Sequence, residues 1–452
     1  MLAERLRRLG QDHIADILED ESRRHEAMRI ESDLGGVDLD LVERIMRGEG
    51  LAEVPPSEVR PAAVVPASFS SSPSAAQCVL AGRRLLEQGK VAALLVAGGQ
   101  ASRLGVESPK GCVEVTPLTG KTLFRVFAEQ ILALGRRFGR PVPWFIMTSP
   151  VNHAQTVEYF TANDFLGLDP RMVFFFPQGV LPSLTGEGKF ILAPEGGLYL
   201  NPDGHGGVFR ALLTSGMFDA MRDLGIEEIF TFQVDNPLVK VCDPLFVGLH
   251  SMQGACMSSK VVRKAGFDEK VGVMVEYGGR TRLLEYSDMD DAIRYATDEN
   301  GEMLHWAGSI AIHLMRLDFA REVASRSHAL PFHRAVKKIP ALAPDGTTVT
   351  VEGIKFETFI FDALAHARTS VTLEVTRSEE FAPVKNLTGT DSLETSRVLQ
   401  SKRHVSWLRA IGVDVRDGVT VEISPLFALD REELASRRAE IGDVITRDTY
   451  LG

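Results

Sequence analysis

Residues 94–111, LLVAGGQASRLGVESPKG, combine residue types that can bind a phosphate group. Gly98 and Gly99 follow an apolar run, and glycine lets backbone N–H groups come close to a ligand. Arg103 and Lys110 add positive charge, with Lys110 eleven positions after Gly99. A glycine pair after a strand is also an ordinary turn, but the Arg and the Pro-Lys-Gly at this spacing favour a nucleotide site. The segment matches neither the P-loop pattern nor GxGxxG.

A carboxylate stands at the end of another apolar run. Asp235 lies in VDNPLVKVCDP, residues 234–244. A carboxylate there is costly to bury unless it meets a cation or a hydrogen-bond donor. Two interpretations remain open, namely a turn or helix-capping Asp-Asn pair and a ligand for Mg²⁺, which takes one or two carboxylates plus phosphate oxygens.

Three further segments carry polar residues in settings that suit ligand binding. His205 lies within the glycine-rich loop NPDGHGG, where a histidine is either structural or functional. Glu285 and Tyr286 stand side by side in LLEYSD, which is also compatible with an ordinary strand edge. Lys385 follows a proline in SEEFAPVKN, and by itself is most simply a solvated lysine.

The elements that must position these residues alternate between short apolar strands and longer helical stretches. The pattern predicts strands within residues 91–99, 141–149, 171–178 and 227–236, and helices within 121–139, 152–165 and 207–225. Continuous apolar strands separated by helices indicate a parallel sheet covered on both faces. Such sheets bind ligands beyond the carboxyl ends of their strands. Residues 271–288 instead predict a hairpin that turns at Gly278-Gly279.

Three regions follow from changes in composition along the chain. Residues 1–77 are predicted to be helical up to about residue 50, followed by an extended Pro/Ser-rich connector at 54–76. Residues 78–386 form the predicted catalytic region, and 387–452 a small C-terminal domain.

Composition excludes several classes of function. The 452 residues are 44% hydrophobic and 25% charged, as in an ordinary soluble globular protein, and the net charge of −11 argues against a general nucleic-acid binder. No apolar run reaches the ~20 residues of a membrane span. The four cysteines form no CxxC pair, and the charged start lacks the apolar centre of a signal peptide. We therefore expect a cytoplasmic protein without nucleic-acid or membrane partners; its oligomeric state is left open.

Taken in order, these segments closely resemble the eukaryotic-type UDP-N-acetylglucosamine pyrophosphorylases, members of the UTP-dependent sugar-1-phosphate uridylyltransferase family. The resemblance runs from LGQDHI near the N-terminus to about residue 386. It is carried by AGGQASRLGVESPKG, FFFPQGVLP, NPDGHGG, VDNPLVKVCDP, LLEYSD, AGSIAIH, EGIKFETFIFDAL and EEFAPVKN.

The resemblance implies an α/β fold, in which a Rossmann-like mixed-sheet catalytic domain carries small N-terminal helical and C-terminal domains. It implies that UTP and N-acetylglucosamine 1-phosphate react to UDP-N-acetylglucosamine and pyrophosphate, with Mg²⁺ as cofactor. Position by position, it also implies residue roles: uridine contacts for Gly98, Gly99, Gln178 and Gly204; phosphate contacts for Lys110, Lys355 and Lys385; a metal-side carboxylate for Asp235; and sugar contacts for Gly272, Glu285 and Tyr286. We expect Lys110 and Lys385 to be catalytic, together with Arg103, whose positive charge lies in the first motif.

Two positions depart from the pattern near the sugar. His205 and Ser309 stand where N-acetylglucosamine enzymes usually carry asparagine, and histidine is what the glucose-1-phosphate branch shows. Tyr286 matches the residue that packs the N-acetyl group. The alternatives are therefore a glucose- or galactose-1-phosphate uridylyltransferase and, from another class, a non-catalytic nucleotide-sugar sensor. A dehydrogenase is excluded because GxGxxG and its following acidic residue are absent.

Overall fold

A computed structural model describes residues 1–52, 59–326 and 330–452. The chain forms two compact units, each assembled from three separate segments. The first unit comprises Met1–Val54, Pro177–Ala211 and Val323–Ala363, and the second comprises Pro55–Phe176, Leu212–Glu322 and Leu364–Gly452.

A mixed sheet forms the centre of the second unit. Its main path runs β1-β9-β11-β7-β2-β3-β4, with β10 paired to β9, and with β8 (Met257–Arg263) paired to both β11 and β14 (Ser370–Glu374). The four predicted strands are all present, as β2 (Val91–Val96), β3 (Trp144–Thr148), β4 (Val173–Pro177) and β7 (Glu228–Gln233). β2 pairs in parallel with β3 and β7, as predicted, whereas β11 (Ala307–Arg316) is antiparallel to β7. The mixed α/β fold class is thereby confirmed.

The register of β2 and β7 brings two predicted site residues to one edge of the sheet. Val96 pairs with Gln233 at the carboxyl ends of the two strands. Gly98 and Asp235 each follow two residues later, so the chain leaves both strands at the same edge. This edge is where parallel sheets bind their ligands.

The helices of the second unit begin and end at recognisable signals. α6 (Leu123–Phe138) is capped by the Thr122 hydroxyl, which accepts a hydrogen bond from the Arg125 amide, and it ends at Gly139 with φ +68°. α7 (His153–Ala162) lies within its predicted range. The stretch predicted as helical at 207–225 contains two helices, α8 (Val208–Thr214) and α9 (Met217–Asp223), because Gly216 takes a left-handed conformation between them.

The predicted hairpin is present. β9 (Val273–Tyr277) and β10 (Arg280–Leu284) pair antiparallel, and Gly278 and Gly279 both have positive φ, as a two-residue type I′ turn requires.

The predicted connector at 54–76 is shorter than expected. Residues 53–58 lie outside the described part of the chain. Beyond them come β1 (Arg60–Pro61), a 3₁₀ turn at Ala67–Ser71, and α5 (Pro73–Glu87). Ser72 caps α5 through the Ala75 amide, and Pro73 occupies the first helical turn. The Ser and Pro that suggested a linker are here the start signals of a helix.

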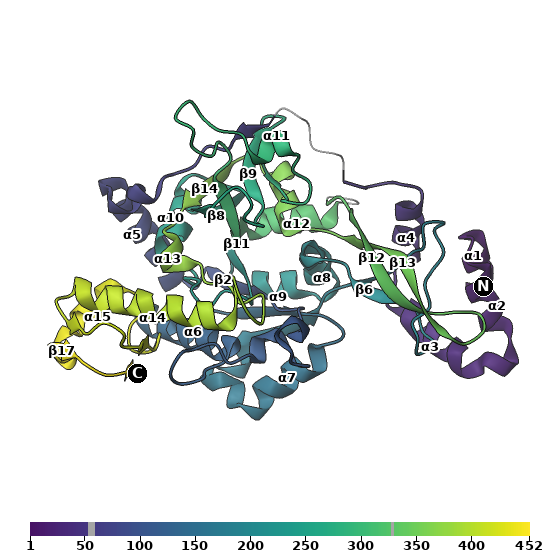
Figure 1. The fold of residues 1–452 in the computed structure, drawn as a ribbon, viewed down its shortest axis with the longest axis horizontal. Coiled ribbons are helices and arrows are strands. Elements are labelled where there is room, and N and C mark those ends of the chain that lie inside the picture. Colours follow the sequence, from purple (N-terminus) through teal and green to yellow (C-terminus); the bar gives the residue numbers. More distant parts are fainter. Residues whose placement is uncertain (53–58, 327–329) are drawn as a thin grey trace. The chain divides into compact units, whose positions relative to one another are not determined.

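α5 and α10 (Pro244–Met252) lie side by side in the second unit (Figure 1). Their contact depends on two glycines. A Cβ on Gly82 would lie 2.0 Å from the Pro244 carbonyl oxygen, and one on Gly248 would lie 1.7 Å from the Cys78 carbonyl oxygen. The two helices therefore meet backbone to backbone.

In the first unit, the predicted N-terminal helices are present and share a core with later segments. They are α1 (Leu2–Arg8), α2 (Asp12–Glu19), α3 (Arg24–Gly35) and α4 (Leu39–Met46). Their apolar side chains cluster with Leu181, Leu198, Phe332 and Phe356. β5 (Val180–Pro182) pairs with β6 (Leu200–Pro202), and β12 (His333–Leu342) forms a long hairpin with β13 (Thr348–Glu357) (Figure 1).

Residues 393–451 contain α14 (Leu393–Ala410), α15 (Arg431–Ser436) and two short parallel strand pairs around a hydrophobic cluster of their own. The domain boundaries at 77 and 386 stay predictions. In the described ranges, the structure contains no helix with the length and apolarity of a membrane span.

Candidate functional site

The loop after β2 folds back on itself and returns Lys110 to the glycine pair. The Ala101 amide donates to the Ser108 carbonyl (3.0 Å), and the Lys110 amide donates to the Gly99 carbonyl (3.1 Å). Gly105, with φ +75°, ends the short turn at Ser102–Leu104 that reverses the chain. This loop accounts for the spacing of the motif, because Gly99 and Lys110 are eleven positions apart in the sequence but neighbours in space.

Asn152, a residue that the sequence analysis did not single out, holds this loop in place. Its fully buried side chain donates from Nδ2 to the carbonyls of Ala97 (2.9 Å) and Gly99 (3.3 Å). Its Oδ1 accepts from the Ser149 amide at 2.8 Å. The turn after β3 thereby fixes the backbone of the turn after β2. An asparagine just beyond a buried strand was the available signal.

Lys110 lies among the charges of three other predicted site residues. Burial lowers the pKa of Lys110, the nearby Asp235 carboxylate opposes this shift, and the Lys385 and Arg103 cations add to it. Three cations and one carboxylate therefore share this edge of the second unit. Such a concentration of positive charge suits phosphate binding in a chain whose net charge is −11.

Lys385 and Asp235 are joined through the backbone. The Val384 amide donates to the Asp235 carbonyl at 2.8 Å, which places the next residue, Lys385, beside the end of β7. The Lys385 ammonium is 3.9 Å from Asp391 Oδ2 and 5.7 Å from the Phe381 ring centre. Its side chain is 39% exposed, so the charge can move toward a ligand.

Gly272, Glu285 and Ser309 also come together in the second unit. The Ser309 amide donates to the Gly272 carbonyl (2.9 Å), and a Cβ on Gly272 would lie 3.2 Å from Glu285 Oε1. Ser309 begins an irregularity in β11, where its hydroxyl accepts from the amide of Ala311, which has φ +55°. Tyr286 follows Glu285 and is 40% exposed. This group combines polar side chains and one carboxylate, which can hydrogen-bond to a polar ligand.

In the first unit, the loop NPDGHGG folds tightly against the end of β13. Gly204 has φ +86°, and a Cβ there would lie 2.3 Å from the Thr358 carbonyl oxygen, so only glycine fits. Thr358 donates from both its amide (2.8 Å) and its hydroxyl (3.0 Å) to the Asp203 carbonyl. Gln178, predicted to contact uridine, is buried in the same unit.

His205 is held as a neutral ring. Its Nδ1 accepts from the Ile360 amide at 3.1 Å, and the ring stacks on Phe359 with centroids 5.1 Å apart. Burial lowers the pKa of His205 to about 4, with a smaller contribution from His333. Because Nδ1 is the acceptor, the proton of the neutral ring sits on Nε2, which makes His205 a hydrogen-bond donor at that atom.

Lys355 projects from β13 in the first unit. Its ammonium lies 5.9 Å from the centre of the Tyr199 ring, and burial lowers its pKa.

Asp203 is a buried carboxylate that the sequence analysis also did not single out. It is 8% exposed, and its Oδ1 has no hydrogen-bond partner among the described residues. The carboxylate packs against two glycines, since a Cβ on Gly179 or Gly207 would lie within 2.6 Å and 2.1 Å of its oxygens. Burial raises the pKa of Asp203 to about 7.

The raised pKa of Asp203 predicts a pH-dependent stability. The folded protein holds the Asp203 proton up to about pH 7, whereas the unfolded chain releases it near pH ~4. The free energy of unfolding therefore decreases as the pH rises from ~4 to about 7. The full penalty above pH 7 is at most about 4 kcal/mol. We expect Asp203→Asn to have a melting temperature close to wild type at pH 5 and above it at pH 8. The same difference in melting temperature between Asp203→Asn and wild type at pH 5 and at pH 8 would contradict this expectation.

The acidic residues of the site suit a Mg²⁺ ion that is bound by one carboxylate together with substrate phosphates. Among residues 1–52, 59–326 and 330–452 there is no group of three or more His, Cys, Asp or Glu side chains that could hold a metal ion. Asp235, half-buried at the edge of the sheet, offers one carboxylate next to the lysines. Mg²⁺ commonly binds through one carboxylate, substrate phosphates and water. Asp235 therefore suits an ion that arrives with a nucleotide.

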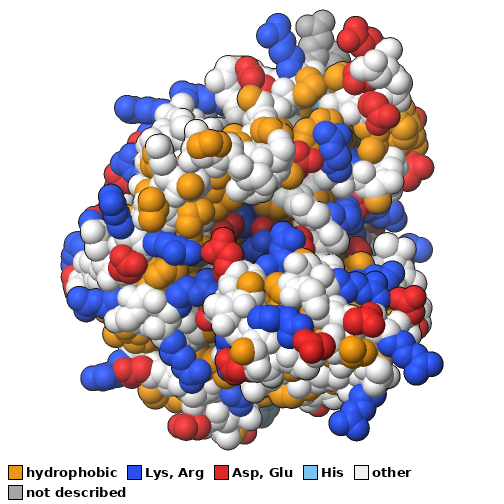
Figure 2. Space-filling model, turned by 90° about the vertical axis from the view of Figure 1, so that its left-hand side faces the viewer, with side chains coloured by type: hydrophobic (Ala, Val, Ile, Leu, Met, Phe, Trp, Pro, Cys, Tyr) orange, Lys and Arg blue, Asp and Glu red, His pale blue; other side chains and the backbone are white. Residues whose placement is uncertain are grey.

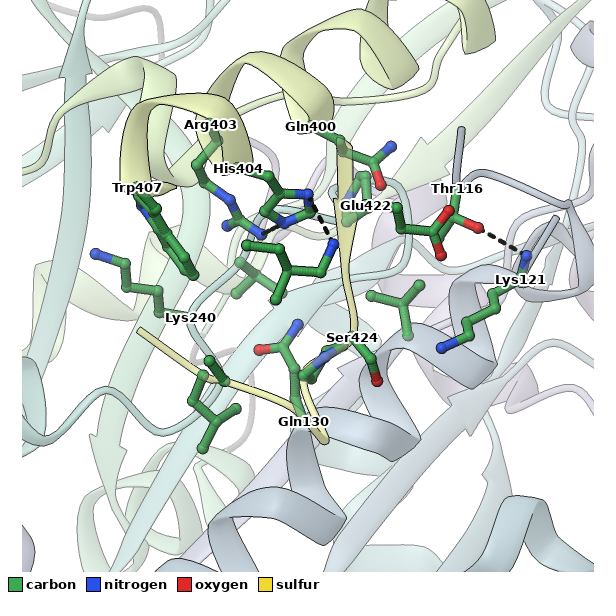
Figure 3. A pocket seen from close by; sticks show the side chains of 17 residues that line it. Thr116, Lys121, Gln130, Lys240, Gln400, Arg403, His404, Trp407, Glu422 and Ser424 are labelled. Carbon is green, nitrogen blue, oxygen red and sulfur yellow. Dashed lines mark hydrogen bonds between the residues drawn. The ribbon is translucent and has the colours of Figure 1, made fainter. Parts of the chain in front are cut away.

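Several cavities of the second unit are lined by other residues, and two of them reach Lys240. One, of about 40 Å³, lies beneath α14 and is lined by Gln130, Gln400, Arg403, His404 and Glu422, among others (Figure 3). It has room for water but not for a nucleotide. The other, of about 220 Å³, is lined by residues of α5, α10 and α15. The face with these helices is hollowed, and charged side chains of both signs surround the hollow (Figure 2).

Comparisons with known proteins agree on one family. The model of the family described as UTP–glucose-1-phosphate uridylyltransferase matches residues 67–430. UDP-N-acetylglucosamine diphosphorylase 2 of Arabidopsis thaliana is 35% identical over 96% of this chain and 90% of its own length. The UDP-N-acetylglucosamine pyrophosphorylase of Saccharomyces cerevisiae is 34% identical over 80% of this chain and 79% of its own.

Solved structures agree as well. The uridine diphosphate N-acetylglucosamine pyrophosphorylase of Trypanosoma brucei, in complex with an inhibitor, has a TM-score of 0.86 and 27% identity, covering 100% of this chain and 97% of that one. A UDP-glucose phosphorylase of the same organism has a TM-score of 0.62 at 17% identity, covering 88% and 84%, and supports the fold alone.

Proposed function

Because the chain belongs to the UTP-dependent sugar-1-phosphate uridylyltransferase family, we propose that it converts UTP and N-acetylglucosamine 1-phosphate to UDP-N-acetylglucosamine and pyrophosphate. The observation that carries this proposal is the edge of the second unit where Lys110 lies among the charges of Asp235, Lys385 and Arg103, next to a glycine turn. The relatives named above supply the substrate class.

The reaction needs positioning and charge neutralisation more than proton transfer. The nucleophile is a phosphate oxygen of the sugar 1-phosphate, which is already ionised at neutral pH, so no general base is required. It attacks the α-phosphorus of UTP; a P–O bond forms to the sugar phosphate, and the bond to the β-phosphate breaks to release pyrophosphate. Two anionic reactants must be brought together in line, which makes oriented cations the main source of catalysis.

The residues of the second unit fit these tasks. Lys110 and Lys385 provide mobile point charges for phosphate oxygens, and the glycine turn at 98–99 offers backbone N–H groups. Asp235 would hold Mg²⁺ together with phosphate oxygens, and the ion would neutralise charge on the triphosphate. Gly272, Glu285, Tyr286 and Ser309 form the proposed sugar end.

The residues of the first unit have separate roles in the proposal. Gln178 and Gly204 provide uridine contacts, Lys355 meets a phosphate, and His205 donates from Nε2 to a sugar oxygen. With its pKa near 4, His205 stays neutral throughout the physiological range and acts as a donor only.

The choice of sugar is the sharpest test of the substrate assignment. We expect N-acetylglucosamine 1-phosphate to be the best substrate and glucose 1-phosphate to react measurably, because His205 and Ser309 replace two amide side chains. One lost neutral hydrogen bond costs ~0.5–1.5 kcal/mol, or roughly a factor of 2 to 13, which weakens discrimination without abolishing it. The measurement is pyrophosphate release from UTP with a panel of sugar 1-phosphates.

Ser309→Asn is the cleaner variant for this test. An asparagine at 309 can accept from the Ala311 amide as the serine does, whereas His205→Asn also loses the ring stacked on Phe359. We expect Ser309→Asn to raise the preference for the amino sugar by a factor in the range above, and the double variant with His205→Asn to raise it further. A wild type that uses glucose 1-phosphate and ignores the amino sugar would instead support the glucose-1-phosphate alternative.

The same assay separates an enzyme from a nucleotide-sugar sensor. A sensor can lose phosphate-binding and metal-side residues without consequence, yet Lys110, Asp235 and Lys385 are all present. Absence of pyrophosphate release with every sugar phosphate, together with tight binding of a UDP-sugar, would favour the sensor.

A further inference from the structure

Asn236 connects the two segments that carry Asp235 and Lys385. Its side chain is 4% exposed; Nδ2 donates to the Glu380 carbonyl (2.7 Å), and Oδ1 accepts from the Ala382 amide (3.1 Å). The same Oδ1 also accepts from the amide of Leu238, two residues along its own loop. Both Nδ2 and Oδ1 of Asn236 therefore form hydrogen bonds to the segment that leads to Lys385.

Lys260 makes a second connection between the same segments. It is fully buried in β8 (Met257–Arg263), and its ammonium lies 2.7 Å from Asp243 Oδ2 and 2.6 Å from Glu380 Oε2. Asp243 ends the loop that begins at Asp235, and Glu380 ends α13 (Arg377–Glu380), just before the segment that leads to Lys385. Burial by itself would lower the pKa of Lys260, but the two carboxylates outweigh burial and raise it.

α14 contacts the same two segments from the C-terminal region. The Arg403 guanidinium donates to the carbonyls of Leu238 (3.4 Å) and Glu379 (3.2 Å), and the Trp407 indole donates to Glu379 Oε2 (2.9 Å). Arg403 and Trp407 lie next to one another on α14 above Lys240 (Figure 3). Both segments are therefore held by polar contacts of side chains that are buried or half-buried.

We propose that Asn236 and Lys260 are positioning residues, which hold Asp235 and Lys385 at the separation that the proposed transfer reaction requires; this inference rests on that proposed function. Asp235 directly precedes Asn236, and its carbonyl is bonded to the residue before Lys385. A buried charged cluster adds little net stability compared with apolar packing. A geometric role accounts for it better, because a displacement of ~1 Å between reacting groups can cost ~10²-fold in rate.

The test separates geometry from stability with three variants. Asn236→Ala removes the amide link. Lys260→Met removes the cation shared by Asp243 and Glu380, although Glu380 keeps its ion pair with Lys240 at 3.6 Å, and is expected to lower the melting temperature as well as the rate. The triple variant Lys260→Met/Asp243→Asn/Glu380→Gln removes all three charges, and the asparagine introduced at position 243 can still cap α10. Asn300→Ala and Lys402→Met, both at exposed positions, are the matched controls.

We expect kcat to fall at least ~10-fold in Asn236→Ala and in the triple variant, with KM for UTP within about twofold of wild type, because the glycine turn at 98–99 is untouched. The triple variant should melt near wild type and remain slow. Calorimetry should show that UTP alone binds as in wild type, whereas the gain in affinity from added Mg²⁺ is reduced. The controls should match wild type in all measurements.

Wild-type kcat in the folded triple variant or in Asn236→Ala, or a rate loss that only follows the folded fraction, would overturn the inference. An error in the proposed function can be told apart from an error in the positioning role of Asn236 and Lys260. If the wild type turns over no sugar phosphate, the activity assignment falls, while the effect of Mg²⁺ on UTP binding in the same variants still decides the positioning role.

Discussion

Replacement of Lys110 or Lys385 by alanine is expected to lower kcat/KM at least ~10²-fold. Each substitution removes a charged contact to a phosphate oxygen, and contacts of this kind contribute ~2.7–4 kcal/mol when they act on charge that develops in the transition state. Neither residue belongs to a hydrophobic core cluster, so melting temperatures should stay close to wild type. Steady-state kinetics with UTP and N-acetylglucosamine 1-phosphate measure the effect.

Lys402→Ala is the matched control for these variants, because Lys402 is an exposed lysine on α14. It should show wild-type kinetics, which rules out a general effect of lower positive charge. Near-normal turnover of a folded Lys385→Ala protein would mean that its ammonium, 3.9 Å from Asp391, serves only a local ion pair.

Asp235→Asn is expected to cause a loss of similar or larger size. The asparagine keeps the shape of the side chain but removes the charge that binds a divalent ion. EDTA should abolish the wild-type activity and Mg²⁺ should restore it, whereas saturating Mg²⁺ should leave Asp235→Asn at least ~10²-fold impaired.

Activity that persists in EDTA would change the role assigned to Asp235. Full wild-type activity in EDTA would show that Lys110, Lys385 and Arg103 neutralise the phosphates without a metal. In that case Asp235 would act on the lysines alone, as the carboxylate that opposes the lowered pKa of Lys110.

The strands, the hairpin and the edge where residues 98 and 235 meet could be predicted from the sequence, because apolar runs and glycine turns are local signals. The return of Lys110 to Gly99 could be expected only from the resemblance, since its cause is a set of backbone hydrogen bonds inside the loop. The start of α5 was missed because Ser72 and Pro73 occur both in linkers and at helix N-termini.

Asp203 and Asn236 could not be predicted as site residues from local sequence, and for Asn152 the local signal was its place just beyond a buried strand. Each acts through partners far along the chain or through the packing of backbone around it, as when Asn236 meets Glu380 and Ala382. The role of Lys260 was hidden for the same reason, since a lysine within an apolar strand is explained only by two carboxylates from other elements.

The backbone contact between α5 and α10 limits which sequences this fold can accept. At Gly82 and Gly248 the obstructing atoms belong to main chain, so no rotamer change in the opposite helix can make room for a methyl group. Enlarging either residue cannot be compensated by shrinking the other, because both are already glycine. In a library randomised at these two positions, selection for folded protein should return glycine at both, although neither residue lies near the proposed chemistry.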